Sequence, residues 1–242
     1  MSHALSALPS LTLVGCGQMG RALLEGWLAA GLAPGAVAVV DPAPPPEATA
    51  LLARAGIVPG RPARPPRVLL LAVKPQIMPA VLADIAGLAG RETLVVSVAA
   101  GKTIASFEAA FGAGARIVRT NPNTPAAGGR GLTGAVANAA CDAADRALAT
   151  TLLEAVGRVV WVEDEALIDV VTAVSGSGPA YVFHMVEAMA RAGVAAGLPE
   201  ATATALARAT VEGAGELLHR AAETPAGQLR TNVTSPNGTT QA

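Results

Sequence analysis

Cysteine and aromatic residues are scarce in this chain of 242 residues, and their scarcity excludes several classes of protein. Cys16 and Cys141 are the only cysteines, too few and too far apart for a disulfide framework or a zinc site. Aromatic residues make up 2% of the sequence and apolar residues 52%, so the core must be built from Ala, Val and Leu. Since disulfides are rare in reducing compartments, we expect a cytoplasmic protein.

Clustered charge and long apolar runs are also missing. The 17 basic and 18 acidic residues give a net charge of −1, without the Lys/Arg cluster of a nucleic-acid-binding protein. No run of about 18 residues is apolar without interruption by Gly, Pro or charge, which argues against a membrane span. Residues 1–10 lack the basic flank of a signal peptide. We therefore expect neither nucleic acid nor a membrane as a partner.

Candidate acids, bases and metal ligands are sparse, most of all in the second half. Lysine occurs only at Lys74 and Lys102, both in the first half. Of the three histidines, His3 lies in the terminal segment, His184 in an apolar helical stretch and His219 near a predicted helix end. Histidines in such places more often have a structural or solvated role than a catalytic one. We predict no metal site.

Residues 11–28 have the order strand, glycine turn, helix. An apolar run at 11–14 leads into the motif Gly15-Cys16-Gly17-Gln18-Met19-Gly20, and helical periodicity follows. This spacing serves a tight turn at Gly15, close approach of a pyrophosphate at Gly17, and close helix-to-strand packing at Gly20. The motif in this context predicts a dinucleotide site with the helix N-terminus facing the phosphates.

Asp41 bears on which dinucleotide binds. It ends a second apolar strand at 37–40, about 20 residues beyond Gly20, where an acid commonly binds a ribose hydroxyl. A carboxylate there repels a 2′-phosphate, so Asp41 favours NADH over NADPH, although either remains open. Prolines at 42 and 44–46 stiffen the next segment, and the alternative is that Asp41 only caps the following helix.

Further apolar runs end in small or polar residues, as strands do at the ligand-binding edge of a parallel sheet. Residues 68–73 lead to Lys74 and Pro75, residues 93–98 to Ala99, and residues 116–119 to a segment that contains Asn123. Lys74 would contact phosphate or substrate, or else be a solvated loop lysine. Strands that alternate with helical stretches predict an α/β fold with a doubly wound parallel sheet.

The second half has only helical periodicity, at about 165–174, 179–196 and 199–219. We therefore predict a dinucleotide-binding domain at 1–162 and a helical domain at 163–242. The stretch 179–196 is apolar around much of its circumference and needs burial on every side. A helical domain of about 80 residues is hard to bury alone, which predicts a homodimer packed through these helices. The alternative is packing entirely against the first domain.

Two segments of the second half are rich in glycine and hydroxyl groups. Residues 175–181 read SGSGPAY, and residues 232–240 read NVTSPNGTT. Glycine lets the main chain approach a ligand, Pro179 suits the first turn of a helix, and free N–H groups there would suit a carboxylate. The alternatives are a helix-breaking linker for the first segment and a disordered tail for the second.

Six segments resemble the pyrroline-5-carboxylate reductase family, and together they span nearly the whole chain. They are GCGQMG at 15–20, LAVKPQ at 71–76, SVAAG at 97–101, RTNPNTPAAGGRGLTG at 119–134, SGSGPAY at 175–181 and QLRTNVTSPNGTT at 228–240. The resemblance implies an N-terminal Rossmann domain and a C-terminal all-α dimerisation domain. It also implies reduction of 1-pyrroline-5-carboxylate to proline, the last step of proline biosynthesis, with NADPH or NADH as the hydride donor.

The resemblance further implies a role for each matching residue. Thr240 and Ser235 would be catalytic, with Thr240 near the imine nitrogen. The substrate would be bound by Ser177, Gly178, Pro179, Asn232, Gly238 and Thr239. The cofactor would be bound by Gly15, Gly17, Gln18, Met19, Gly20, Asp41, Ala72, Val73, Lys74, Pro75, Ala99 and Asn123. An iminium carbon accepts hydride without a protein nucleophile, so such a site needs mainly alignment and electrostatics.

The sequence departs from the family at several places. Asn237 stands where the family usually has glycine, Thr231 where an acid is common, and Asn121 where methionine is common. The family continues through another helix, whereas this sequence ends at Ala242, so we expect the helical domain to lack that helix. The alternatives are a related imine reductase and a catalytically impaired, truncated nucleotide-binding protein. A β-hydroxyacid dehydrogenase would need a lysine in the second domain.

Overall fold

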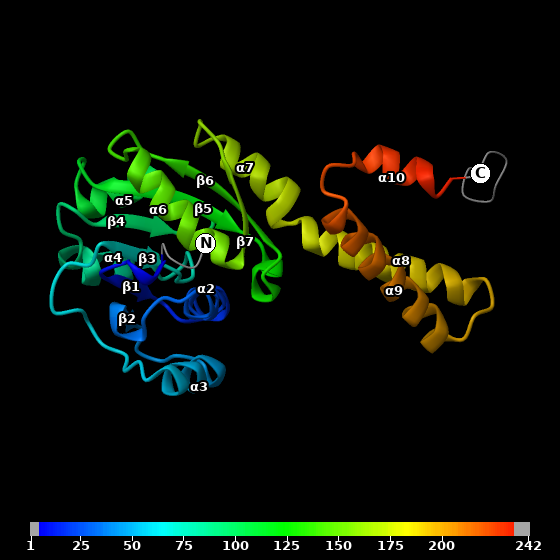
Figure 1. The fold of residues 1–242 in the computed structure, drawn as a ribbon, viewed down its shortest axis with the longest axis horizontal. Coiled ribbons are helices and arrows are strands. Elements are labelled where there is room, and N and C mark those ends of the chain that lie inside the picture. The colour runs from blue at the N-terminus through cyan, green and yellow to red at the C-terminus, as the bar shows by residue number, and fades with distance from the viewer. Residues whose placement is uncertain (1–4, 235–242) are drawn as a thin grey trace. The chain divides into compact units, whose positions relative to one another are not determined.

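The computed structural model describes residues 5–234, which form parts of two compact units, Met1–Pro179 and Ala180–Ala242 (Figure 1). The division falls within the long helix that begins at Gly178. The predicted domain boundary near residue 162 lies earlier in the chain and stays a prediction.

A seven-stranded sheet forms the centre of the first unit. Its strands are β1 (Leu11–Val14), β2 (Val37–Val40), β3 (Val68–Leu71), β4 (Leu94–Ser97), β5 (Arg116–Pro122), β6 (Gly131–Ala137) and β7 (Gly157–Trp161). Their order is β2-β1-β3-β4-β5-β6-β7, and β1 to β5 are mutually parallel, whereas β6 is antiparallel to β5. Every residue of β1, β3 and β4 is buried, as expected for strands covered on both faces.

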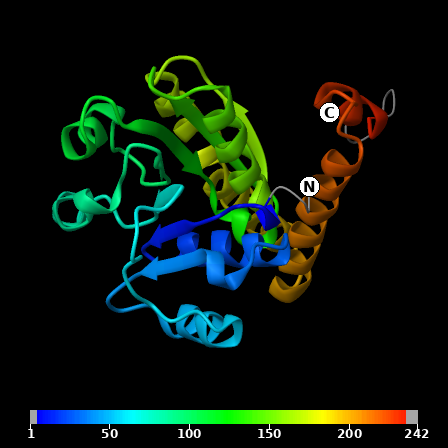
Figure 2. The same ribbon diagram turned by 60° about the vertical axis from the view of Figure 1, so that its left-hand side comes forward.

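Helices cover both faces of the sheet, which confirms the predicted doubly wound α/β class (Figure 2). On one face, α2 (Gln18–Ala29), α3 (Pro46–Ala55) and α6 (Ala143–Leu153) enclose a core around the fully buried Trp27. The Trp27 indole N–H donates to the carbonyl oxygen of Leu152 at 2.8 Å. On the other face, α4 (Met78–Ile85), α5 (Ile104–Phe111) and α7 (Leu167–Val171) enclose a core around Phe107.

Strands β6 and β7 were not predicted from the sequence. Strand β6 has the composition GLTGAVA, with two glycines, which weaken any local preference for a strand. The starts of the two strands approach so closely that a side chain at Gly157 would collide with the backbone of Gly131. This edge of the sheet therefore depends on backbone contacts between segments distant in sequence.

A buried carboxylate connects three elements at the amino-terminal edge of the sheet. Asp145 is fully buried, and its Oδ1 accepts hydrogen bonds from Arg67 at 2.9 Å and from Arg116 at 3.4 Å. It also forms the capping box of α6 with Asp142. Two arginines offset the cost of burying this charge, and the cluster connects α6 to the starts of β3 and β5, at the edge opposite the strand ends that carry the candidate site.

The second unit consists of helices. They are most of α8 (Gly178–Ala195), α9 (Glu200–Arg220) and α10 (Ala226–Asn232), of which α10 was not predicted. Helices α8 and α9 pack closely, since a side-chain carbon at Gly193 would lie 3.1 Å from Cβ of Ala203. Many apolar side chains of α8 and α9 are nevertheless exposed, among them Tyr181, Phe183, Met185, Leu206, Leu217 and Leu218. Within residues 5–234, no helix is both long and apolar enough to span a bilayer.

Residues 175–178, predicted as a glycine-rich loop before a helix that begins at Pro179, are mostly helical instead. A π-helical turn covers Thr172–Gly176, directly after α7, and α8 begins at Gly178 with Pro179 in its first turn. The N–H of Ser177 donates to the carbonyl oxygen of Thr172 at 2.8 Å, so it is not a free donor. The earlier expectation of free backbone N–H groups was therefore wrong at Ser177.

Candidate dinucleotide site

The turn between β1 and α2 requires glycine at its first and last positions. Gly15 has φ of +87°, and an added Cβ would lie 2.7 Å from Cγ1 of Val73 and 2.8 Å from the carbonyl oxygen of Ala72. A side chain at Gly20 would collide with the carbonyl oxygen of Gly15. Side chains at these two positions would push α2 away from the strand ends.

Gly17 has a different environment. It is the N-cap of α2, with φ of −69°, and no heavy atom lies within 4 Å of the position of an added Cβ. The N-terminus of α2 therefore adjoins open space, and the missing side chain allows a ligand to approach the main chain. Unpaired N–H groups and the helix dipole make such a terminus suitable for a phosphate.

Asp41 contacts the glycine turn directly. Its Oδ2 accepts a hydrogen bond from the backbone N–H of Cys16 at 2.7 Å, and its Oδ1 accepts one from the N–H of Ala43 at 3.0 Å. The alternative that Asp41 caps the next helix was wrong, because Pro45 is the N-cap of α3. Burial, and then the negative charge of Asp41, raise the pKa of the Cys16 thiol to about 11. The Cys16 thiol is consequently protonated and uncharged at neutral pH.

A cleft of about 670 Å³ opens at the carboxyl ends of β1, β2 and β3. The chain moves from β1 to β2 on one side and returns to β3 on the other, so the strand order reverses at β1. Such a reversal leaves a crevice where nucleotides bind in open α/β sheets. The cleft brings together six of the predicted cofactor residues, namely Gly15, Gly17, Asp41, Ala72, Val73 and Lys74.

Two walls of the cleft consist of residues that were not predicted as site residues from the sequence. Pro42, Ala43 and Pro45 line it on the β2 side, and Ile77, Val81 and Asp84 line it on the α4 side. For the first wall, the proline run at 42–46 was the only feature of the sequence that could have indicated these residues. The second wall follows from the helical spacing of α4, which places positions 77, 81 and 84 on one face.

The other predicted cofactor residues lie outside the lining of this cleft. Gln18 is exposed and Met19 half-buried in the first turn of α2, and Pro75 follows Lys74 in the turn before α4. Ala99 is 4% exposed and packs in the core around Phe107. Asn123 follows β5, and both ends of its amide bind within the protein. A role of these five positions toward the cofactor stays a prediction.

Asn123 connects the end of β5 to the π-helical turn. Its Oδ1 accepts a hydrogen bond from the N–H of Leu132 at 2.8 Å, and its Nδ2 donates to the carbonyl oxygen of Ser175 at 3.1 Å. The turn leads directly into Ser177, Gly178 and Pro179, the predicted substrate residues of this segment. The hydroxyl of Ser175 is buried without a hydrogen-bond partner in the described structure.

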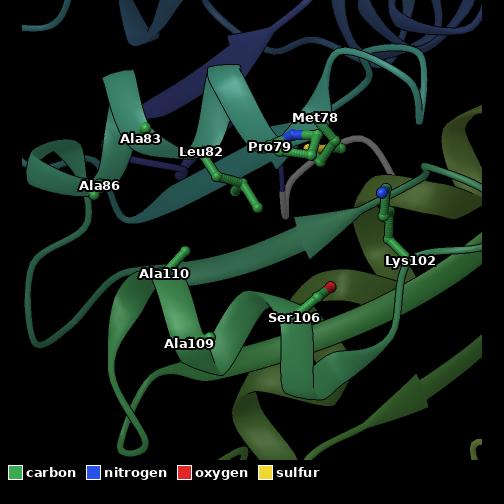
Figure 3. A pocket seen from close by; sticks show the side chains of 9 residues that line it. All are labelled: Met78, Pro79, Leu82, Ala83, Ala86, Lys102, Ser106, Ala109 and Ala110. Carbon is green, nitrogen blue, oxygen red and sulfur yellow. The ribbon is translucent and has the colours of Figure 1, made fainter.

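A second hollow, of about 390 Å³, lies between α4 and α5 (Figure 3). Its walls are mainly apolar, and its polar side chains are Lys102 and Ser106. The other lining residues are Met78, Pro79, Leu82, Ala83, Ala86, Ala109 and Ala110. None of the predicted site residues lines it, because α4 separates this hollow from the dinucleotide cleft.

The remaining predicted residues lie beyond the first unit. Asn232 ends α10, and its Oδ1 accepts a hydrogen bond from Nε2 of Gln228 at 2.8 Å. Ser235, Gly238, Thr239 and Thr240 lie outside the described residues, so their predicted roles stay predictions. Among residues 5–234, no three His, Cys, Asp or Glu side chains are grouped so that they could hold a metal ion.

The fold and the cleft define a class, the oxidoreductases that bind a dinucleotide on a Rossmann-type sheet. Models of known protein families match both halves of the chain. Residues 10–101 match the family described as "NADP oxidoreductase coenzyme F420-dependent". Residues 165–242 match the family described as "Pyrroline-5-carboxylate reductase dimerisation".

Individual relatives narrow this class. A pyrroline-5-carboxylate reductase of Pseudomonas aeruginosa is 49% identical over 72% of this chain and 64% of its own length. One of Escherichia coli is 38% identical over 94% of this chain and 85% of its own. The solved structure of a pyrroline-5-carboxylate reductase from Coxiella burnetii matches with a TM-score of 0.88 and 34% identity, over 97% of this chain and 88% of that one. The chain belongs to the pyrroline-5-carboxylate reductase family.

Proposed function

We propose that this protein reduces the cyclic imine of 1-pyrroline-5-carboxylate to L-proline with NADH or NADPH. The observation that carries the proposal is the cleft at the reversal of strand order, with Gly17 open toward it, in a chain of this family. The family relationship gives the substrate, and the cleft provides room for the hydride donor.

The residues of the cleft would hold the cofactor without taking part in bond breaking. The N-terminus of α2 at Gly17 would bind the pyrophosphate, and Asp41 would hold the turn and face the ribose. Lys74, which is exposed at the carboxyl end of β3, would add positive charge near the phosphates. The bound cofactor supplies the hydride, and the protein supplies its alignment.

The substrate would be held by hydroxyl and backbone groups. We propose that Ser177, Gly178 and Pro179 lie along the ring, and that Ser235, Gly238, Thr239 and Thr240 hold the carboxylate and the imine nitrogen, with Asn232 nearby. A protonated imine carries its own positive charge, so it accepts hydride without a strong acid on the protein. This accounts for a site that needs neither lysine nor histidine in the second half of the chain.

The charges of the cleft favour NADH over NADPH. Its lining holds Lys74 and two carboxylates, of which Asp84 is paired with Arg61, whereas Asp41 forms no ion pair among residues 5–234. A 2′-phosphate near Asp41 would meet a negative charge that two backbone N–H groups hold in place. Arg54, Arg61 and Arg64, the next basic residues along the chain that could bind a 2′-phosphate, are not among the lining residues.

We further propose that the second unit forms a homodimer. Helix α8 exposes Phe183 by 62% and Met185 by 47%, and α9 exposes Leu206 by 55%. Within this unit of a single chain, such side chains would cost free energy in water, and a second copy would bury them. The dimerisation family that matches residues 165–242 supports this reading. A cytoplasmic location fits the two free cysteines.

The first prediction concerns turnover. Purified protein mixed with reduced cofactor and 1-pyrroline-5-carboxylate is expected to oxidise the cofactor and form proline stoichiometrically, measured by cofactor absorbance and amino-acid analysis. Turnover of another cyclic imine alone would favour a related imine reductase. Cofactor binding without turnover of any imine would favour a nucleotide-binding protein that has lost catalysis.

The second prediction concerns the donor. The wild type is expected to have a higher kcat/KM for NADH than for NADPH, and Asp41→Ser is expected to shift that ratio toward NADPH by about tenfold, because the charge facing the 2′-phosphate is removed. Asp84→Ser is a control on the opposite wall and is expected to change the ratio less. A wild-type preference for NADPH that Asp41→Ser leaves unchanged would show that the Asp41 carboxylate does not face the 2′ position.

The third prediction concerns assembly. Sedimentation equilibrium is expected to give a mass of at least two chains, and Leu206→Glu is expected to weaken association, since a buried charge opposes an apolar interface. Arg208→Gln, at an exposed position of the same helix where Arg208 pairs with Glu212, serves as a control. A monomer at all concentrations of wild type would contradict the proposal.

A further inference from the structure

Three polar side chains at alternate positions of one strand contact the segment that leads to α8. Arg119, Asn121 and Asn123, on β5 and directly after it, are two residues apart in sequence, so they point to the same face of the strand. Arg119 bonds to Glu165 just before α7, whereas Asn121 and Asn123 bond to Thr172 and Ser175 of the π-helical turn. Strand β5 and the residue after it thereby contact this segment at three successive positions along the chain.

The first contact fixes the start of the segment. Arg119 is 6% exposed, and its Nη1 donates to Oε1 of Glu165 at 2.8 Å. The same carboxylate oxygen accepts the backbone N–H of Ile104, at the start of α5, at 2.8 Å. Charge-assisted hydrogen bonds of this kind are stronger than neutral ones. The residues just before α7 are therefore anchored independently of the contacts further along.

The middle contact is a relay of hydrogen bonds that ends inside the helix. Nδ2 of Asn121, a residue 6% exposed, donates to Oγ1 of Thr172 at 2.7 Å. That hydroxyl donates in turn to the carbonyl oxygen of Ile168 at 2.7 Å. Each bond of such a chain polarises the next and strengthens it. The relay fixes Thr172, the first residue of the π-helical turn, against β5.

Thr172 also bonds to the residue that precedes α8. Its carbonyl oxygen accepts the N–H of Ser177, five residues later, which is the hydrogen bond that widens the turn. The turn lies close to Asn121, because an added Cβ at Gly176 would lie 3.1 Å from Nδ2 of Asn121. A substitution at Asn121 would therefore alter contacts at Thr172 and at Gly176, the first and last residues of the turn.

We propose that Asn121 is a positioning residue for the reductase: through Thr172 it holds the π-helical turn in the register that presents Ser177, Gly178 and Pro179 to the imine substrate. This inference rests on the proposed function. Asn121 itself need not touch the substrate, since its Nδ2 already donates to Thr172. Its loss is expected to affect use of the imine while leaving the dinucleotide cleft, which is built from other strands, intact.

The test compares Asn121→Leu and Thr172→Val with Thr172→Ser, which keeps the hydroxyl. Thr150 provides a matched control: its Oγ1 donates to the carbonyl oxygen of Arg146, four residues earlier, at 2.9 Å and accepts the indole N–H of Trp161 at 3.0 Å. Thr150→Val removes the same kind of relay, from a half-buried threonine of α6, far along the chain from the turn.

Asn121→Leu and Thr172→Val are each expected to lower kcat/KM for the imine about tenfold, with the dissociation constant of the reduced cofactor changed by less than about twofold. The double variant is expected to lose little more than either single variant, because both break one relay. Thr172→Ser is expected to restore most of the activity, and Thr150→Val to keep it. Equal losses in imine use and cofactor affinity, or losses that add fully, would overturn the proposal.

A measurement that needs no substrate separates this inference from the proposed function. In hydrogen exchange of the intact protein, Asn121→Leu is expected to speed exchange of amides at 172–178 by about tenfold and to leave those of α2 unchanged. Unchanged exchange at 172–178 would overturn the positioning role even in an active enzyme. If Asn121→Leu speeds exchange of these amides but the wild type reduces no imine, Asn121 still holds the turn and the proposed function is overturned instead.

Discussion

The contact between the first turn of α2 and the glycine turn before it is the constraint on which the site depends. Because a side chain at Gly20 would collide with the carbonyl oxygen of Gly15, only glycine lets the helix start so close to the end of β1. That proximity directs the helix N-terminus into the crevice left by the reversed strand order. Asp41 then bonds to the same turn from the neighbouring strand. Helix, turn and adjacent strand thus form one rigid wall of the cleft.

Strand β5 has a comparable role on the other side of the first unit. The buried Arg119 and Asn121 of β5, with the half-buried Asn123 directly after it, connect the sheet to Glu165 before α7 and to the π-helical turn. The cleft is lined instead by residues at and beyond the ends of β1, β2 and β3. The two groups of contacts share no side chain. The proposed cofactor cleft and the proposed substrate segment therefore have separate structural supports in one sheet, which suits the proposed catalysis by alignment.

The sequence predicted the first five strands, the glycine turn and the α/β class, because buried parallel strands and the glycine spacing are local signals. Strands β6 and β7 were missed because the glycines at 131, 134 and 157 obscure the pattern. Close contacts with distant segments explain these glycines: the backbone of the facing segment at Gly131 and Gly157, and the side chain of Val171 at Gly134. The π-helical turn was read as a loop, since glycine and serine favour loops wherever tertiary bonds such as Asn121 to Thr172 are unknown. Asn121 was noted as a departure from the family, but its partner could not be inferred.

Binding of reduced cofactor to Gly17→Ala tests the central claim, that the open space at the N-terminus of α2 receives the dinucleotide. Gly17 has ordinary backbone angles and no neighbour within 4 Å of an added carbon, so the variant should fold with a melting temperature within a few degrees of wild type. The account predicts an NADH dissociation constant roughly tenfold or more above that of wild type, because the methyl group occupies the space of the pyrophosphate. A folded Gly17→Ala protein that binds NADH as tightly as wild type would contradict it.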